Sequence, residues 1–218
     1  SGWLVASSTT VGVGDASVEV SSVTCHSAEI GPGGVFVAIR GSQTDGHRYL
    51  DAALQRGAVA IVTSREDLHL PTTVATVVVP DPARALARLA AAFYHYPGRK
   101  LTVIGITGTN GKTTTAWAVE RVLTASGLRA GCLGTLTWNL GAEVWPSTHT
   151  TPPGHTLQRL FHLMVNHGIE AVAMEVSSHA LEQGRVEGVP FRVGVFTNLT
   201  SDHLDYHGTR ERYLAAKT

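Results

Sequence analysis

The stretch that decides the fold runs Leu101-Thr102-Val103-Ile104-Gly105-Ile106-Thr107-Gly108-Thr109-Asn110-Gly111-Lys112-Thr113-Thr114-Thr115. It opens with a short run of apolar and β-branched residues, which predicts a buried strand. A glycine-rich turn follows, and residues 116–123 have helical character. A strand, a glycine loop, a lysine-threonine pair and a helix in this order make up a phosphate-binding loop. We therefore expect this stretch to bind a nucleoside triphosphate.

The residue types of this loop suit phosphate binding. Gly108 and Gly111 let backbone N–H groups curl around phosphate oxygens with no Cβ in the way. A helix that starts near Lys112 adds the positive end of its dipole. Lys112 supplies a flexible charge for the β- and γ-phosphates, and the hydroxyl of Thr113 can ligate Mg²⁺. Ile106 stands where the strict pattern has a glycine, so a glycine-rich β-turn before an ordinary helix is the alternative interpretation.

Composition excludes several classes of partner. In 218 residues, 17 basic and 17 acidic side chains cancel, so no charge excess attracts nucleic acid or an anionic membrane. Hydrophobic runs are short, and the chain opens without a signal-peptide pattern. The two cysteines, Cys25 and Cys132, lie far apart, which favours free thiols in a reducing compartment. We expect a cytoplasmic protein with no nucleic acid or membrane partner.

The first 98 residues predict a small mixed α/β domain. Apolar runs indicate strands at 35–39, 59–62 and 74–79, and helical spacing indicates helices at about 47–55 and 82–94. Tyr96-Pro97-Gly98-Arg99 then breaks the pattern. We place the boundary of an N-terminal domain, 1–98, at this point.

Residues 99–218 alternate strands with helices. After the phosphate loop, strands are expected at 130–133, 170–176 and 191–196, and helices at about 154–166 and from 209 onward. This alternation is typical of a mostly parallel, doubly wound sheet, which binds ligands at the carboxyl ends of its strands. The expected fold class is therefore α/β, with a small mixed domain followed by a phosphate-loop domain that has a mostly parallel, doubly wound sheet.

Polar residues follow two of these expected strands. Glu175 ends an apolar run, and a carboxylate in such a run is unfavourable unless it is paired or bound to a metal. Residues 198–207 concentrate aspartate and histidine after the next strand. A polar surface loop is the alternative interpretation of this second group.

Four motifs resemble those of the Mur ligase family. Residues 104–114 resemble its ATP loop, which accounts for the shifted glycine spacing. The others are Thr150-Thr151-Pro152, Met174-Glu175-Val176-Ser177-Ser178-His179-Ala180-Leu181 and Asp202-His203-Leu204-Asp205-Tyr206-His207-Gly208. Together they are most similar to the family members that add the third peptide residue to UDP-N-acetylmuramoyl-L-alanyl-D-glutamate. Folylpolyglutamate and cyanophycin synthetases share the ATP loop and remain alternatives.

The resemblance implies roles for particular residues. ATP would bind Gly108, Thr109, Asn110, Gly111, Lys112, Thr113 and Thr114. One Mg²⁺ would be held by Thr113 and Glu175, and a second by His203. Lys217, in Tyr213-Leu214-Ala215-Ala216-Lys217, would be carbamylated and would complete a catalytic set with Lys112, Glu175 and His203. Substrate contacts would fall on Cys25, Ser27, Ser42, Gln43, Thr44, Thr150, Thr151, Ser177, Gln183 and Arg185, although His26-Ser27-Ala28 replaces the family's frequent Asp-Ser-Arg.

The implied reaction is an ATP-dependent amide ligation through an acyl phosphate. Its partners are the UDP-N-acetylmuramoyl dipeptide and an amino acid, and the enzyme would be a monomer. On this resemblance the chain lacks the rest of the ATP domain and the domain that selects diaminopimelate, lysine or another amino acid. We expect these 218 residues to be inactive alone. A nucleotide-dependent protein that is not a ligase remains an alternative from a different class.

Overall fold

The computed structural model describes residues 11–13, 19–41, 44–200 and 208–216. The chain divides into two compact units, 1–93 and 94–218. The division falls between Phe93 and Tyr94, whereas the sequence placed it after residue 98. The connecting residues pack on the second unit: a Cβ on Gly98 would lie 3.0 Å from Pro190 and 3.5 Å from Phe161.

The first unit is a five-stranded sheet in the order β1-β5-β4-β3-β2. Strands β2 to β5 run parallel to one another, and β1 pairs antiparallel with β5. The strands are β1 (Val11–Val13), β2 (Ser22–Thr24), β3 (Gly34–Val37), β4 (Ala58–Thr63) and β5 (Ala75–Val78). The helices are η1 (Ser27–Glu29), η2 (Gly46–Tyr49), α1 (Leu50–Gln55) and α2 (Pro82–Phe93). The helix expected at 47–55 therefore begins as a 3₁₀ turn.

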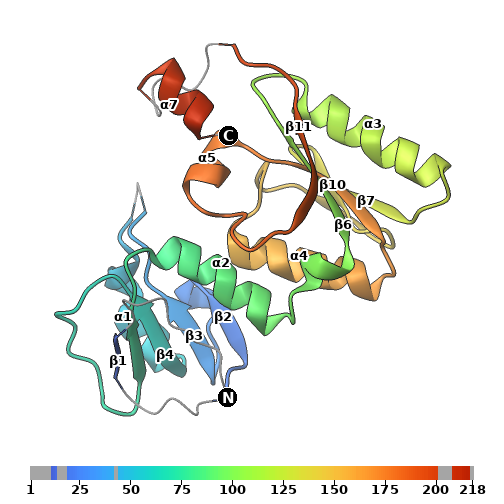
Figure 1. The fold of residues 1–218 in the computed structure, drawn as a ribbon. Coiled ribbons are helices and arrows are strands. Elements are labelled where there is room, and N and C mark those ends of the chain that lie inside the picture. Colours follow the sequence, from blue (N-terminus) through green and yellow to red (C-terminus); the bar gives the residue numbers. More distant parts are fainter. Residues whose placement is uncertain (1–10, 14–18, 42–43, 201–207, 217–218) are drawn as a thin grey trace. The chain divides into compact units, whose positions relative to one another are not determined.

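Strand β3 shows why two helices cover this sheet. Successive side chains of a strand point to opposite faces. Phe36 accordingly packs in one apolar cluster with Ala53 of α1, whereas Val35 and Val37 pack in another with Leu86 of α2. The helices α1 and α2 lie on opposite faces of the sheet (Figure 1).

The second unit is a six-stranded sheet in the order β11-β6-β10-β7-β8-β9. Its first four strands are parallel, and β8 and β9 form an antiparallel hairpin next to β7. The strands are β6 (Thr102–Thr107), β7 (Ala130–Leu133), β8 (Thr137–Asn139), β9 (Val144–Pro146), β10 (Ala171–Glu175) and β11 (Phe191–Phe196). The helices are η3 (Pro97–Lys100), α3 (Lys112–Ala125), α4 (Gly154–Asn166), α5 (Ser178–Glu182) and α7 (Arg210–Ala215).

Helices cover both faces of the parallel part of this sheet. Helix α4 buries Leu157, Leu160, Phe161 and Met164 in a cluster with side chains of β6 and β10. Helix α3 packs Ala116 against the other face, and the two helices lie on opposite sides of the sheet (Figure 1). This arrangement confirms the predicted α/β class with a mostly parallel, doubly wound sheet.

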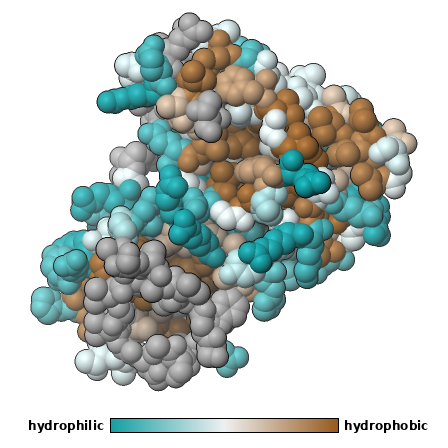
Figure 2. Space-filling model, in the orientation of Figure 1, coloured by the Kyte–Doolittle hydropathy of each residue, from teal (hydrophilic) through white to brown (hydrophobic). Residues whose placement is uncertain are grey.

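Strand β11 forms one edge of this sheet and carries exposed apolar side chains. Phe191, Val193 and Phe196 are 36%, 48% and 42% exposed. Figure 2 shows hydrophobic surface over this strand. Among the helices of the described ranges, none combines the length and apolar character that crossing a membrane requires.

Candidate functional site

The loop between β6 and α3 has the backbone that its glycines allow. Gly108 and Gly111 have φ angles of +138° and +83°, in the region that side chains disfavour. A Cβ on Gly108 would also collide with the hydroxyl of Thr197. These two positions therefore require glycine.

Lys112, the first residue of α3, folds back over this loop. Its Nζ donates hydrogen bonds to the carbonyl oxygens of Gly108 and Thr109, at 2.9 and 2.8 Å. The ammonium group is thus held over the loop by the loop's own backbone. A bound anion at this position would attract the same charge.

A cavity of about 280 Å³ opens beside the loop. It lies at the carboxyl ends of β6, β7 and β10, where a doubly wound sheet places its ligands. Five phosphate-loop residues thus line the same cavity as residues at the carboxyl ends of the neighbouring strands β7 and β10. The lining consists of Thr109, Asn110, Gly111, Lys112, Thr113, Thr135, Thr150, Glu175, Ser177, Ser178 and Tyr213.

Glu175 lies at the end of β10 with its carboxylate fixed by one neighbour. Thr135 donates its backbone N–H to Oε1 at 2.8 Å and its hydroxyl to Oε2 at 3.1 Å. The hydroxyl of Thr135 also lies 3.0 Å from that of Thr150. A side chain on Gly134 would collide with the Glu175 carboxylate. Sequence reasoning missed Gly134 and Thr135; their position directly after a parallel strand was the available signal.

A hydrogen-bond network continues from Glu175 to the residues expected to contact the substrate. Thr151 donates its hydroxyl to the carbonyl of Glu175 at 2.9 Å and accepts the N–H of Ser177 at 3.0 Å. Arg185 donates to the carbonyl of Thr151 at 3.0 Å and twice to the side chain of Gln183, at 2.9 and 2.7 Å. The fold thus brings together the members of this set that lie in the second unit.

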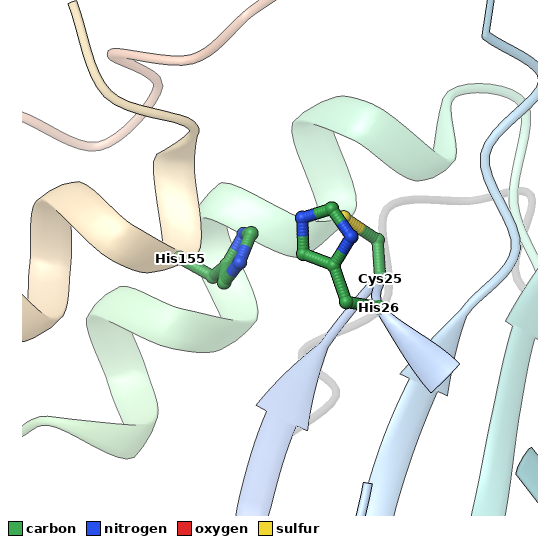
Figure 3. Close-up of side chains that lie close together, drawn as sticks. All are labelled: Cys25, His26 and His155. Carbon is green, nitrogen blue, oxygen red and sulfur yellow. The ribbon is translucent and has the colours of Figure 1, made fainter. Parts of the chain in front are cut away.

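The remaining expected substrate contacts lie in the first unit. Cys25 and His26 directly follow β2 (Figure 3), and Ser27 opens η1. Thr44 is exposed, and its carbonyl accepts the N–H of Gly41 at 2.9 Å. The expected site residues Ser42, Gln43, His203 and Lys217 lie outside the described residues.

Cys132, on β7, is a free thiol. Burial, with smaller contributions from the charges of Glu120 and Glu175, raises its pKa to about 12. The thiol is therefore held in its protonated, unreactive form.

This fold and cavity define a doubly wound α/β protein with a glycine-rich loop between a strand and a helix, and comparison with known proteins places it in a family. The model of the Mur ligase middle domain matches residues 106–218, and that of the Mur ligase family catalytic domain matches residues 19–94. The chain belongs to the Mur ligase family.

Two curated relatives carry the same name. The UDP-N-acetylmuramoyl-L-alanyl-D-glutamate–2,6-diaminopimelate ligase of Geobacillus thermodenitrificans is 49% identical over 91% of this chain and 40% of that protein. The ligase of the same name from Geobacter metallireducens is 47% identical over 94% of this chain and 40% of that protein. The chain therefore spans about 40% of the length of these relatives.

Solved structures agree with the fold. A structure of a UDP-N-acetylmuramoyl-L-alanyl-D-glutamate–2,6-diaminopimelate ligase superposes with a TM-score of 0.74 at 30% identity, over 92% of this chain and 40% of that one. The MurF ligase of Thermotoga maritima, in complex with ADP, superposes with a TM-score of 0.60 at 29% identity, over 92% of this chain and 42% of that one.

Proposed function

We propose that this chain provides the ATP-binding and UDP-substrate-binding parts of a ligase. The ligase adds 2,6-diaminopimelate to UDP-N-acetylmuramoyl-L-alanyl-D-glutamate in peptidoglycan precursor synthesis. The names of the two relatives support 2,6-diaminopimelate as the amino acid that is added. The ligase would be a cytoplasmic monomer. Residues 1–98 would serve mainly the UDP substrate, and residues 99–218 would serve ATP.

One observation carries the proposal: the phosphate loop and Glu175 line the same cavity. Glycine-rich backbone and Lys112 supply positive potential for a triphosphate. Glu175 places a carboxylate at the same cavity, where it would help to hold a divalent cation. Thr150 and Ser177 line the same cavity with hydroxyl groups, which suit a peptide carboxylate as the phosphoryl acceptor.

The donor set at this cavity suits Mg²⁺. Thr113 and Glu175 offer a hydroxyl and a carboxylate, which are the hard oxygen ligands that Mg²⁺ prefers. The two hydrogen bonds from Thr135 hold the carboxylate of Glu175 in one orientation, as partners behind a metal ligand do. When bound, Mg²⁺ would neutralise charge that develops on the phosphates.

The residues of this chain would act by positioning and by charge. Lys112 would leave the carbonyls of Gly108 and Thr109 and pair with the phosphate oxygens of ATP. The γ-phosphoryl group would pass to the substrate carboxylate, breaking its bond to ADP and forming an acyl phosphate. The amine of the amino acid would attack that carbonyl carbon, lose a proton and release phosphate. Lys112 would stabilise the transferred group throughout.

Calorimetric titration tests the binding half of this proposal. We expect the chain to bind ATP with Mg²⁺, and to bind the UDP-muramoyl dipeptide separately. Lys112→Ala should weaken ATP binding at least 10-fold and leave dipeptide binding unchanged, because it removes only the charge that faces the phosphates. Lys100→Ala, an exposed lysine of η3 outside the cavity, is the matched control.

The outcomes separate the classes of function. Unchanged ATP affinity in Lys112→Ala would contradict the phosphate-loop assignment. ATP binding without any dipeptide binding would favour a nucleotide-dependent protein that is not a peptidoglycan ligase.

A further inference from the structure

The backbone of Asn110, in the phosphate loop, is held by the residues that follow β11. The backbone N–H of Asn110 donates to Oδ1 of Asn198, and Nδ2 of Asn198 donates to the carbonyl of Asn110, both at 3.0 Å. The hydroxyl of Thr197 donates to the same carbonyl at 2.6 Å. One side-chain amide thus pairs with both polar groups of a loop residue 88 positions away.

This pairing fixes the orientation of the amide as well as the loop. The N–H of Asn110 requires an acceptor and its carbonyl requires a donor, so only one arrangement of the Asn198 amide satisfies both. Asn110 is exposed, and water could replace either bond. These bonds therefore contribute by fixing the two peptide planes on either side of Asn110, and not by satisfying buried polar groups.

The neighbouring residue of the loop is held from the same segment. Thr109 donates its N–H to the carbonyl of Asn198 at 2.9 Å, and its hydroxyl accepts the N–H of Thr200 at 3.0 Å. That hydroxyl also lies 3.2 Å from the hydroxyl of Tyr213, which is buried on α7. Two consecutive loop residues are thus hydrogen-bonded to the segment that follows β11, and one of them also to α7.

We propose that Asn198, assisted by Thr197, is a positioning residue that holds the phosphate loop in its curled conformation before nucleotide binds. The inference rests on the proposed function, because the ligand of the loop is taken to be ATP. A loop already ordered loses less conformational entropy on binding, so its ligand binds more tightly. Asn198 acts through the backbone of Asn110 and has no required contact with ATP.

The test measures ATP affinity by calorimetry in the presence of Mg²⁺, with dipeptide affinity as a second readout. We expect Asn198→Ala to raise the Kd for ATP about 10-fold, the effect of losing two ordering hydrogen bonds. Asn198→Asp keeps the acceptor for the N–H but sets a carboxylate oxygen against the carbonyl of Asn110, so its loss should be at least as large. Asn166→Ala, at the exposed end of α4, should bind ATP as the unaltered chain does.

A second pair of variants carries the test if Asn198→Ala fails to fold. Thr197→Ser keeps the hydroxyl and should retain ATP affinity, whereas Thr197→Val removes the hydroxyl at similar volume and should weaken binding several-fold. Equal ATP affinities within this pair, or an unaltered Kd in a folded Asn198→Ala variant, would overturn the inference. Equal losses of ATP and dipeptide affinity would also overturn it, because they would indicate general destabilisation. Failure of the unaltered chain to bind ATP would instead contradict the proposed function.

Discussion

At the scale of the residue, the orientation of Glu175 depends on Thr135. Thr135→Val removes the hydroxyl that donates to Oε2 and leaves the backbone N–H on Oε1. If Glu175 holds Mg²⁺ as proposed, the freed oxygen should make ATP binding require several-fold more Mg²⁺. Thr135→Ser should restore the requirement of the unaltered chain. The measurement is ATP affinity as a function of Mg²⁺ concentration, and identical curves for all three proteins would rule out this role.

Cys132 gives a prediction of pH dependence at the same scale. Its pKa is raised from 9.0 to about 12, so the folded chain keeps the thiol protonated where an unfolded chain has begun to ionise. Stability from this group is present below about pH 9 and falls as pH rises toward 12. In a Cys25→Ser variant at pH 8, Cys132 should react with Ellman's reagent about three orders of magnitude more slowly than a free thiol. The guanidinium-unfolded variant should react at the ordinary rate; a fast native reaction would contradict the raised pKa.

At the scale of the element, α4 holds one face of the second sheet. Phe161 is fully buried among side chains of that face. Phe161→Ala should lower the free energy of unfolding by about 3–5 kcal/mol, because it removes apolar contacts and leaves a cavity. Arg159→Ala, on the exposed side of the same helix, should change it by less than about 0.5 kcal/mol. Chemical denaturation compares the two variants, and similar losses would show that α4 does not anchor the sheet through Phe161.

At the scale of the whole molecule, every residue that lines the cavity belongs to the second unit. A ligand that binds only the folded unit stabilises it by about 2.7 kcal/mol at 100 times its Kd. ATP with Mg²⁺ should therefore slow amide hydrogen exchange most in residues 108–115 and 197–200. Exchange in β4 of the first unit should change much less. Hydrogen exchange read by mass spectrometry checks this, and equal protection of both units would count against a nucleotide site built from one unit.

Long, strongly patterned elements could be predicted from the sequence. Helix α4 was expected at 154–166 and is found at Gly154–Asn166, because its apolar spacing runs over several turns. The hairpin of β8 and β9 was not expected. Each of its strands is three residues long, which is too short to show the alternation of apolar and polar residues that indicates a strand. The phosphate loop could likewise be predicted, because its glycines and its lysine are adjacent in sequence. The glycines allow the curled backbone, and the lysine supplies the positive charge.

The sequence by itself determined the α/β class, the strand-loop-helix that forms a phosphate loop, and the carboxylate at the end of β10. Only the tertiary structure decided which residues hold these groups in place. Thr135 contacts Glu175 across 40 residues, and Asn198 contacts Asn110 across 88. No local periodicity or composition in the sequence indicates that such distant residues are in contact. They meet because parallel strands that are distant in sequence bring their carboxyl ends to one edge of the sheet.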